Sequence, residues 1–581
     1  MILRSSFFKL LKEDMKRRIW CISLFSIILF LSMPVLTALR LQNTSSGQIP
    51  VMLSYSLGPE NSYLLALVVI FSVVCGLSSF FYLHSRKKVD LYHSLPMKRE
   101  LIFGVNFING LLIFFIPYFI NLVLSAAVGM MHNAITSSII GVMAWGLLVH
   151  TLYYCMLYTV TIIAVMLTGN IITSFLGTMV FFSYGYILLG VKDSYFTTFF
   201  TTYYNGNGYN TQAVISYLSP VGCYYRLVSL FRMEEPLAIT LAVHFGIVMM
   251  LIGIALLLFK KRASEAAGKS MSFELSKPII KFLLVIPLSL GGGIVLRNAV
   301  NDNTSGWLIF GIILSLIIMN GIIQVIFNFD IRAALHNKRQ LALCAIITVS
   351  IVGIFKYDMF GYDSYMPKLS DIKSMGLFVN INNNDYNNMF YYDDELNYVD
   401  PVRYHLKRPL QKDMNVAYEL TKFAIDNQET TQNHVASTKS LKVRYNLKNG
   451  RTVYRRYYYR GEDVPLREEL FDSQEFKKSH YPILEWKLRE IQSIMVYPNT
   501  QMGDESSIVT TLELKDDKLN EFLSIYKEEL SKLTYEEAII DKTMASLDIS
   551  IHDRGGNMFY VYPSFVKSLA YIKERGLDIG N

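Results

Sequence analysis

Residues 19–39 read IWCISLFSIILFLSMPVLTAL and contain no charged side chain. A bilayer core about 30 Å thick requires about 20 apolar helical residues, because backbone amides in hydrocarbon must be satisfied within the helix. Basic residues precede this run, and it has no small-residue cleavage site. It therefore predicts a retained membrane anchor rather than a removable signal peptide.

Further runs of the same kind occur along the first 355 residues. The sequence predicts a polytopic α-helical membrane protein with about nine spans. The spans are expected at 19–39, 61–83, 101–129, 138–168, 170–191, 237–259, 278–297, 305–328 and 341–355.

Composition excludes an ordinary cytosolic enzyme. The 581 residues are 52% apolar and only 18% charged, with a mean hydropathy of +0.30, whereas soluble domains are about a quarter charged. Through Phe355 the net charge is +13, and from Lys356 onward it is −5. The basic part fits anionic lipid, but basic and aromatic residues are not interleaved as in a nucleic-acid groove, so we expect no nucleic-acid partner. The five cysteines show no CxxC pair and predict neither a disulfide framework nor a metal site.

Loop charges orient the spans, because cytoplasmic loops retain Lys and Arg. With the N-terminus inside, the inner segments hold 20 basic residues and the outer segments five. Nine spans then place residues 356–581 outside the cell. We expect a multi-pass protein of the bacterial plasma membrane with a cytoplasmic N-terminus.

Two inner segments are candidates for a mechanical role. Residues 1–18 form a basic amphipathic pattern that is typical of a helix lying in the membrane interface, although it could also be only a charged flank that orients the first span. The loop 84–100, HSRKKVDLYHSLPMKRE, places apolar residues within a charged stretch, and Pro96 can begin a new helix. A cytosolic helix with exposed apolar residues usually has a partner.

The motif HSLPMKR at 93–99 resembles the first intracellular coupling segment of bacterial type-2 ABC transporter permeases, in which the third span begins just after a Leu-Pro pair. Residues 218–225, LSPVGCYY, resemble the extracellular gate region of that family. Residues 262–269, RASEAAGK, are similar to the stretch after the sixth span in Firmicutes members, which are Gram-positive bacteria. The resemblance covers roughly residues 1–275, and the three further spans with a large outer domain fit a subgroup whose C-terminal domain has no assigned function.

The resemblance implies a division of the chain into an elbow helix (1–18), a six-span permease core (19–260), a cytoplasmic loop (261–277), three additional spans (278–355) and an extracytoplasmic α+β domain (356–581). It also implies two groups of site residues. Those expected to couple to an ATPase are Val89, Leu91, Tyr92, Leu95, Pro96 and Arg99, and those of the extracellular gate are Leu218, Ser219 and Pro220.

Residues 263–270, ASEAAGKS, also satisfy a permissive phosphate-loop pattern. A phosphate loop requires a strand and a helix that hold its backbone N–H groups around the phosphates. Here a membrane span precedes the motif, so we expect no nucleotide at this site and no cofactor or catalytic residue on this chain. ATP and Mg²⁺ would be bound by a separate ATPase polypeptide.

Polar residues inside spans are the usual functional candidates in membranes. His150, His244 and several asparagines lie within the predicted spans, but no Asp or Glu lies mid-span, which disfavours an ion-coupled transporter. The simpler interpretation is that these side chains bond neighbouring helices. The same holds for Gly291–Gly293, which predict close helix packing or a kink.

The outer domain has the pattern of an α+β fold with an internal duplication. Residues 374–462 and 490–575 each predict a strand, a helix and a hairpin, with turn glycines at Gly450 and Gly556. The acidic run 393–395 lacks the ligand spacing of a calcium loop and predicts a solvated face, and the histidines are dispersed. We expect no metal. The tyrosines and arginines at 455–460 could read an external ligand, although strand alternation would bury every second one.

The resemblance and the residues together predict the permease subunit of an ATP-driven exporter of a peptide or an envelope-associated substrate. Its expected partners are an ABC ATPase dimer, a second permease copy or a paralogous permease, membrane lipids and the exported substrate. The alternative is a signalling or force-transmitting membrane protein, in which the ATPase moves the outer domain without translocating a substrate.

Overall fold

The computed structural model describes residues 2–94, 97–206, 217–232, 238–300, 305–379, 391–392, 398–428, 439–460, 463–486, 491–498, 512–539, 543–551 and 554–577. The chain divides into two compact units. The helical unit comprises Met1–Ser194 and Tyr209–Gly353. The sheet unit comprises Tyr195–Gly208 and Ile354–Asn581.

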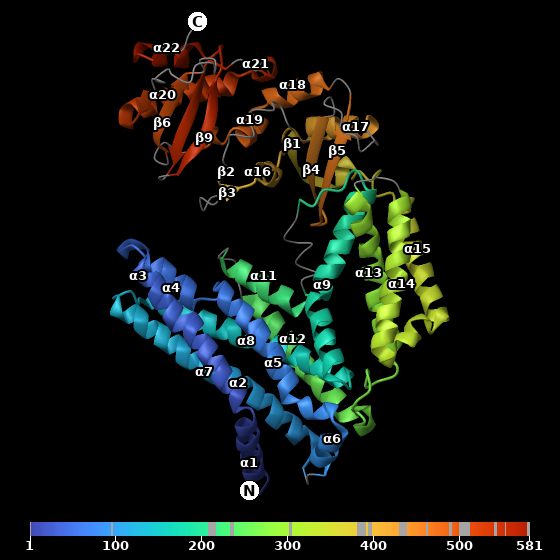
Figure 1. The fold of residues 1–581 in the computed structure, drawn as a ribbon. Helices are drawn as coiled ribbons and strands as arrows, with labels where there is room; N and C mark the ends of the chain where they lie inside the picture. Colours follow the sequence, from blue (N-terminus) through green and yellow to red (C-terminus); the bar gives the residue numbers. More distant parts are fainter. Residues whose placement is uncertain are drawn as a thin grey trace. The chain divides into compact units, whose positions relative to one another are not determined.

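Within the described residues, nine helical segments are long and apolar enough to cross a membrane, which agrees with the expected polytopic architecture (Figure 1). They are Ile19–Gln42 (α2, η1 and α3), Ile49–Ser79 (α4 and α5), Arg99–Met131 (α7), Ser137–Leu167 (α8), Ile171–Phe199 (α9), Ala238–Lys261 (α12), Ser276–Val300 (α13), Ser305–Asn328 (α14) and Lys338–Lys356 (α15). A basic helix, α1 (Ile2–Arg17), precedes them.

The second span differs most from its predicted bounds of 61–83. It begins earlier, with α4 (Ile49–Leu57), and α5 (Ser62–Ser79) ends before the 3-10 turn η3 (Phe81–His84). Asn61 separates the two helices, because its side-chain oxygen accepts from the N–H groups of Tyr63 and Leu64 at 3.2 and 3.3 Å. This is an N-cap, which satisfies amides that have no partner within the helix.

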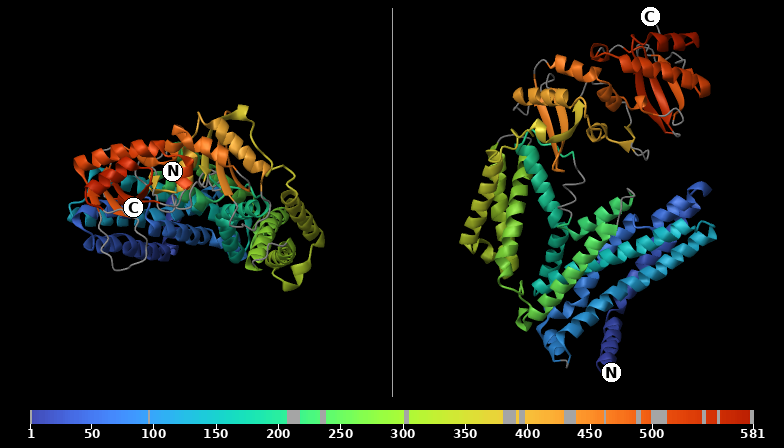
Figure 2. Two further views of the ribbon diagram at one scale, coloured as in Figure 1. Left: turned by 90° about the horizontal axis from the view of Figure 1, so that it is seen from above. Right: turned by 180° about the vertical axis from the view of Figure 1, so that it is seen from behind.

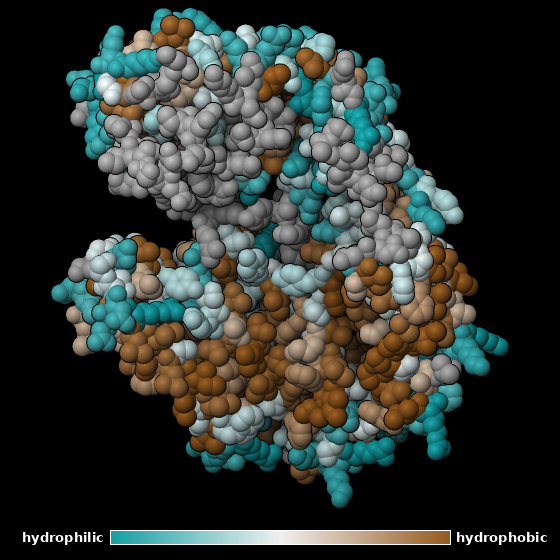
Figure 3. All heavy atoms as spheres, turned by 45° about the horizontal axis from the view of Figure 1, so that its top comes forward, coloured by the Kyte–Doolittle hydropathy of each residue, from teal (hydrophilic) through white to brown (hydrophobic). Residues whose placement is uncertain are grey.

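The helical unit carries an apolar exterior. Figure 3 shows hydrophobic side chains gathered in a band over the helices. Large apolar side chains of these helices are exposed, and Ile70, Phe119, Met250 and Ile313 are each about half exposed. Such a continuous apolar surface is typical of helices that face lipid.

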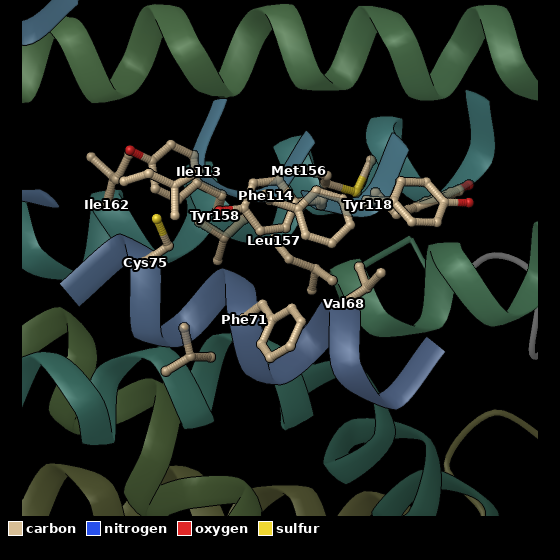
Figure 4. Packing of buried hydrophobic residues seen from close by; sticks show 14 of the residues in the cluster. Val68, Phe71, Cys75, Ile113, Phe114, Tyr118, Met156, Leu157, Tyr158 and Ile162 are labelled. Carbon is tan, nitrogen blue, oxygen red and sulfur yellow. The ribbon is translucent and has the colours of Figure 1, made fainter. Parts of the chain in front are cut away.

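Aliphatic and aromatic side chains form the core of the six-span part, and aromatic rings join α7 to α8 (Figure 4). Phe114 of α7 stacks on Tyr154 of α8 with ring centroids 4.1 Å apart, and the Tyr154 hydroxyl donates to the Gly110 carbonyl at 2.8 Å. A Cβ atom at Gly110 would lie 2.0 Å from the Tyr158 hydroxyl oxygen. Glycine is therefore required for the close approach of α7 and α8.

Helices α13, α14 and α15 lie side by side (Figures 1 and 2). Their common core is formed by Val285, Leu316, Ile323 and Cys344. A Cβ atom at Gly292 would lie 1.9 Å from the hydroxyl oxygen of Ser315, so the glycines of α13 allow α13 and α14 to touch. This agrees with the expected role of Gly291–Gly293 in close packing.

The sheet unit contains two larger antiparallel sheets. The first has the order β1-β4-β5, formed by Ile372–Val379, Lys439–Leu447 and Thr452–Tyr459. The second has the order β7-β6-β8-β9, formed by Leu512–Leu514, Ile491–Pro498, Ala545–Ile551 and Arg554–Val561. A short pair, β2 (Tyr391–Tyr392) and β3 (Tyr398–Val399), is separate.

Helices pack around these sheets. They are α16 (Pro401–Lys407), α17 (Met414–Asp426), α18 (Val464–Asp472), α19 (Gln474–His480), α20 (Asp516–Lys532), α21 (Tyr535–Ile539) and α22 (Val566–Glu574). On β5, Tyr457 and Tyr459 are fully buried and Tyr458 is half-buried. This is the strand alternation expected for that segment.

Each sheet is built from a strand, a helix and a hairpin in the same chain order: β1, α17 and β4-β5, then β6, α20 and β8-β9. Gly450 lies in a turn with a φ of +82°, as its sequence context predicts. Gly556 does not lie in a turn but within β9, which pairs with β8 through Ile551 and Arg554. Residues 552–553 and the acidic run 393–395 lie outside the described residues, and the duplication itself stays a prediction.

Candidate functional site

The predicted coupling loop begins with a short helix, α6 (Arg86–His93). Leu91 on this helix is 60% exposed, whereas Val89 is 2% exposed and belongs to the core that contains Leu83 and Phe259. The side chain of Val89 is therefore packed into the bundle, and its role in coupling stays a prediction. Leu95 and Pro96 lie outside the described residues.

Tyr92 connects α6 to two other parts of the helical unit. Its ring stacks on Tyr82 with centroids 4.0 Å apart and an interplanar angle of 16°. Its hydroxyl accepts a hydrogen bond from Arg17 Nη1 of α1 at 3.1 Å. The face of α6 that carries Val89 and Tyr92 is thus packed, and the face that carries Leu91 is free to meet another molecule.

Both ends of the loop are tied to the segment that follows α12. Arg86 Nε donates to the Ala267 carbonyl at 3.3 Å. Arg99, the first residue of α7, donates through Nη1 to the carbonyls of Lys260 and Arg262 at 3.0 and 3.2 Å. These bonds hold the loop against the end of α12. A displacement of α6 would therefore be transmitted to both α7 and α12.

Arg262 is buried and donates hydrogen bonds to backbone carbonyls at the ends of α8 and η3. It is 4% exposed, and its Nη1 donates to the carbonyls of Met166 at 3.0 Å and Thr168 at 2.6 Å, at the C-terminus of α8. Its Nη2 donates to the Leu83 carbonyl at 3.1 Å. A cation at a helix C-terminus satisfies orphan carbonyls and complements the helix dipole.

Burial changes the pKa values of Arg262 and of its neighbour His84. Burial lowers the pKa of the Arg262 guanidinium to about 10, so it stays protonated at neutral pH. Burial, with a smaller contribution from Arg262, lowers the pKa of His84 to about 4. His84 is therefore neutral at pH 7, and its Nε2 lies 3.3 Å from the hydroxyl of Ser174 at the start of α9.

The phosphate-loop-like segment 263–270 has a different structure from a phosphate cradle. The Gly268 N–H donates to the Gly169 carbonyl at 2.8 Å, and Thr168 and Met271 form an antiparallel bridge. A Cβ atom at Gly169 would lie 2.0 Å from the Ala266 carbonyl oxygen. The segment is thus paired with the α8–α9 connection, and its Gly268 amide already has a protein partner.

Helix α1 is joined to the bundle by a buried polar network. Arg18 is 5% exposed, forms an ion pair with Asp14, and donates to the Ser79 hydroxyl at 2.6 Å. Asn109 of α7 donates to Asp14 Oδ2 at 2.8 Å. The Tyr158 hydroxyl donates to Ser79 Oγ at 2.8 Å. The amphipathic segment is therefore fixed to α5, α7 and α8 at its C-terminal end.

The predicted gate residues lie at the start of α11 (Pro220–Arg232). Ser219 is fully buried, donates to the Phe182 carbonyl of α9, and accepts from the Gly222 N–H at 3.3 Å. Pro220 occupies the first helical position, which suits its fixed φ. Leu218 is 54% exposed. Ser219 thus links α11 to α9, whereas Leu218 faces outward.

Beneath α11 lies a buried cluster of histidines and tyrosines. His150 Nδ1 is hydrogen-bonded to the Tyr224 hydroxyl, and His244 Nδ1 to that of Tyr153. Tyr153 and Tyr224 stack with centroids 4.6 Å apart, and Tyr153 also donates to the Cys223 carbonyl at 3.2 Å. The two histidines therefore bond neighbouring helices, the simpler of the two roles considered for them. The tyrosines gave no sequence signal, because aromatic residues are common in spans.

A second cluster, which the sequence did not indicate, lies in the sheet unit where α9 and α15 end. Phe355 of α15 packs against Phe196 and Phe200, with ring centroids 5.3 and 5.6 Å away. Tyr362 stacks on Phe200 at 4.5 Å and lies under the Arg455 guanidinium, 3.9 Å from its ring centroid. The ends of the fifth and ninth spans are thus joined in one aromatic cluster.

The chain continues from this cluster into the first sheet. Tyr203 forms an antiparallel bridge with Arg455 of β5, and the Arg456 N–H donates to the Thr202 carbonyl at 2.9 Å. Asp363 accepts from the N–H groups of Thr201 and Thr202, both at 3.0 Å. Residues 201–203 therefore extend the edge of β5, although about 250 residues separate them from it in sequence.

Comparison with known proteins gives one partial match. Residues 445–554 match the model of a domain of unknown function, DUF6449, which covers part of the first sheet and much of the second. No curated protein and no solved structure matches the chain.

Proposed function

We propose that this chain is the membrane subunit of an ATP-driven exporter, and that a separate ATPase docks on α6. The observation that carries the proposal is the two-sided character of this helix. Val89 and Tyr92 fix it to the bundle, while Leu91 projects an apolar side chain with 60% exposure from a strongly basic loop. An exposed apolar residue on a rigid, tethered helix is suited to a protein partner.

The path from α6 supports coupling rather than simple attachment. Arg86 and Arg99 bond the segment after α12, and Arg262 in that segment bonds the end of α8. Ser219, just before α11, donates to the carbonyl of Phe182, which lies near the middle of α9. A movement of α6 on ATP binding would therefore shift helices that lead to the expected gate. Such a shift requires that the ATPase bind the two conformations with different affinity.

The shared cluster of α9 and α15 supports the expected orientation. Their C-terminal ends belong to the same compact unit, as expected if both spans end on the same side of the membrane. With alternating crossings, the fifth and ninth spans end on the same side. The inner loops on the opposite side are the basic ones, which fits a cytoplasmic α6 and an external sheet unit.

Exchange of Leu91 for Asp tests docking without disturbing the packed face of α6. We expect Leu91→Asp to abolish co-purification of the ATPase encoded beside this gene or supplied as a candidate, because a charge replaces the apolar contact. The matched control is Ile331→Asp, which alters an 82% exposed residue of another inner loop, in η5 (Ile331–Leu335). Retained co-purification by the Leu91 variant, with an unchanged elution volume, would remove α6 as the docking site.

The second candidate function, force transmission to the outer unit, is favoured by the aromatic cluster and by the bridge between Tyr203 and Arg455. Both lie within the sheet unit and join the segment 195–203, where α9 ends, to β5. A fluorophore on exposed Lys373 of β1 would report motion of this unit when ATP is added to the reconstituted complex. Motion that accompanies ATP turnover without movement of any candidate substrate would choose this function over export.

A further inference from the structure

A cavity of about 370 Å³, partly open to the exterior, lies within the helical unit, between α9, α13 and α14 and beside the end of α8. Its lining is almost entirely apolar and includes Leu176, Tyr184, Leu284, Leu288, Ile322 and Phe327. The volume lies within the range of small-ligand sites, which is about 300 to 1,000 Å³.

The cavity is bounded at both ends along the helices. Near the outer end, a Cβ atom at Gly291 of α13 would lie 3.4 Å from Val191 Cγ2 of α9. At the inner end, the Thr173 hydroxyl donates to the Ser270 carbonyl at 3.1 Å, and the Ser270 hydroxyl donates to the Phe327 carbonyl at 2.6 Å. Helix α9 thus contacts α13 at the outer end of the cavity and the segment around Ser270 at the inner end, and the cavity lies between these contacts.

The position of the cavity along α9 sets its depth in the membrane. From Thr173 to Tyr184, both of which line it, the helix rises about 16 Å at about 1.5 Å per residue. This is close to half of the hydrocarbon core, which is about 30 Å thick. Because Thr173 lies near the basic inner loops, the cavity spans the depth of the cytoplasmic leaflet in the proposed orientation.

The lining chemistry decides what fills this space. Water in a cavity needs two or more polar partners, and apolar cavities stay dry. The side chains that line an empty apolar cavity lack dispersion contacts on the side that faces the space. A cavity at this depth is surrounded by lipid tails, so an acyl chain is the occupant that restores those contacts.

A basic residue lies at the inner end, where a lipid headgroup would be. Lys269 is exposed and precedes Ser270 and Met271, of which Met271 lines the cavity. The ammonium group of a lysine near the membrane surface attracts anionic lipid phosphate. Lys269 would therefore lie beside the headgroup of a lipid whose tail occupies the apolar cavity.

We propose that this cavity holds one acyl chain of an anionic phospholipid from the cytoplasmic leaflet, and that Lys269 attracts its headgroup through the net negative charge. The inference takes from the proposed function only the orientation of the chain. It does not depend on an ATPase or on transport.

The full-length protein in detergent micelles is incubated with phosphatidylglycerol that carries a diazirine midway along one acyl chain, and adducts are mapped by mass spectrometry after irradiation. We expect adducts concentrated on the cavity residues of α9, α13 and α14. Gly177→Phe fills the cavity, because Gly177 lines it with only Ala164 Cβ within 4 Å of an added Cβ. Gly190→Phe is the control on the same helix, at an exposed glycine with nothing within 4 Å.

Gly177→Phe should lose the cavity adducts while Gly190→Phe keeps them, with both variants eluting as the parent protein. Lys269→Glu should weaken labelling by phosphatidylglycerol about fivefold, equivalent to about 1 kcal/mol, and leave labelling by diazirine phosphatidylcholine unchanged. Native mass spectrometry of the unaltered chain gives a check that needs no variant, with one phosphatidylglycerol retained through detergent exchange. Adducts spread over the whole apolar surface, or unchanged in Gly177→Phe, would overturn the site. Equal labelling by both lipids in the unaltered chain would overturn the headgroup contact.

Discussion

The carboxylate of Asp363 accepts hydrogen bonds from the backbone N–H of Thr202 at 3.0 Å and from its hydroxyl at 2.7 Å. Asp363 follows the ninth span and Thr202 follows the fifth. The two residues join segments that are distant in sequence, and they hold residues 201–203 beside β5. Both residues belong to the sheet unit, so the contact fixes two segments of this unit that are far apart in the sequence.

Replacement of Asp363 by Ala should release this segment. Two backbone and two hydroxyl donors lose a charged acceptor, and each such hydrogen bond contributes about 1.5 to 3 kcal/mol. We expect faster hydrogen exchange of the amides at 201–202 and 456, measured on the full-length protein in nanodiscs. Asp371→Ala, an exposed carboxylate of the same unit, is the control. Equal protection in both variants would show that the aromatic cluster alone holds the segment.

Replacement of Arg262 by Met should destabilise the helical unit by about 3 kcal/mol or more, because buried carbonyls of α8 and η3 lose their donor. The measurement is the thermal unfolding midpoint in a fixed detergent. The adjacent Lys261 is exposed, so Lys261→Met removes the same charge without a buried contact. Similar midpoints for the two variants would contradict the capping role.

The Arg18–Asp14 pair allows a double-mutant test. Removal of one partner of a buried pair costs about 3 to 5 kcal/mol, because the other charge is left uncompensated. Arg18→Leu should therefore be less stable than the double variant Asp14→Leu/Arg18→Leu, as judged by thermal unfolding. A double variant that is the less stable of the two would mean that Asp14 is held by Asn109 and contributes without Arg18.

The sheet unit should lose stability in mild acid. Burial lowers the pKa of His480 to about 3, and burial followed by the charge of His480 lowers that of His405 well below its usual value. The unfolded chain, with a histidine pKa of about 6.5, therefore binds more protons between pH 6.5 and 3. Stability is complete above about pH 6.5 and falls as the pH is lowered, by about 2 to 3 kcal/mol at pH 4.5 for His480.

Urea unfolding of the sheet unit can be followed by Trp486, which packs edge-on against Phe559 at 5.6 Å. Trp20, Trp145 and Trp307 are replaced by Phe in the reporter protein. His480→Phe keeps an aromatic ring beside Phe476, whose centroid lies 5.6 Å away, and should flatten the pH dependence without removing it. An unchanged slope would assign the acid response to other groups.

The sequence was sufficient for the spans but not for their connections. Length and hydropathy located the nine apolar segments, since each must satisfy the same membrane thickness. The end of the second span was wrong because Phe81–His84 is apolar enough to continue a helix, yet it folds into a 3-10 turn that Arg262 caps. Arg262 itself was counted only as one positive charge among many.

The candidate site was predictable in part. The apolar residues of the inner loop identified α6, but they did not reveal which of them face the core. Val89 and Tyr92 pack inward, whereas Leu91 faces outward. This division depends on Tyr82 and on Phe259 and Arg17, of which the last two are distant in sequence. The pairing of residues 201–203 with β5 could not be predicted, because three residues without hydrophobic alternation carry no strand signal. Their pairing is determined by Asp363 and β5.

The sheet unit is discontinuous in sequence, and this affects any attempt to produce it in soluble form. A fragment cut at Ile354 and extended to the C-terminus would omit Tyr195–Gly208. It would leave β5 with an open edge, which invites pairing with other molecules and precipitation. A better truncation would include Tyr195–Gly208, connected by a linker to the fragment, so that this segment can pair with β5.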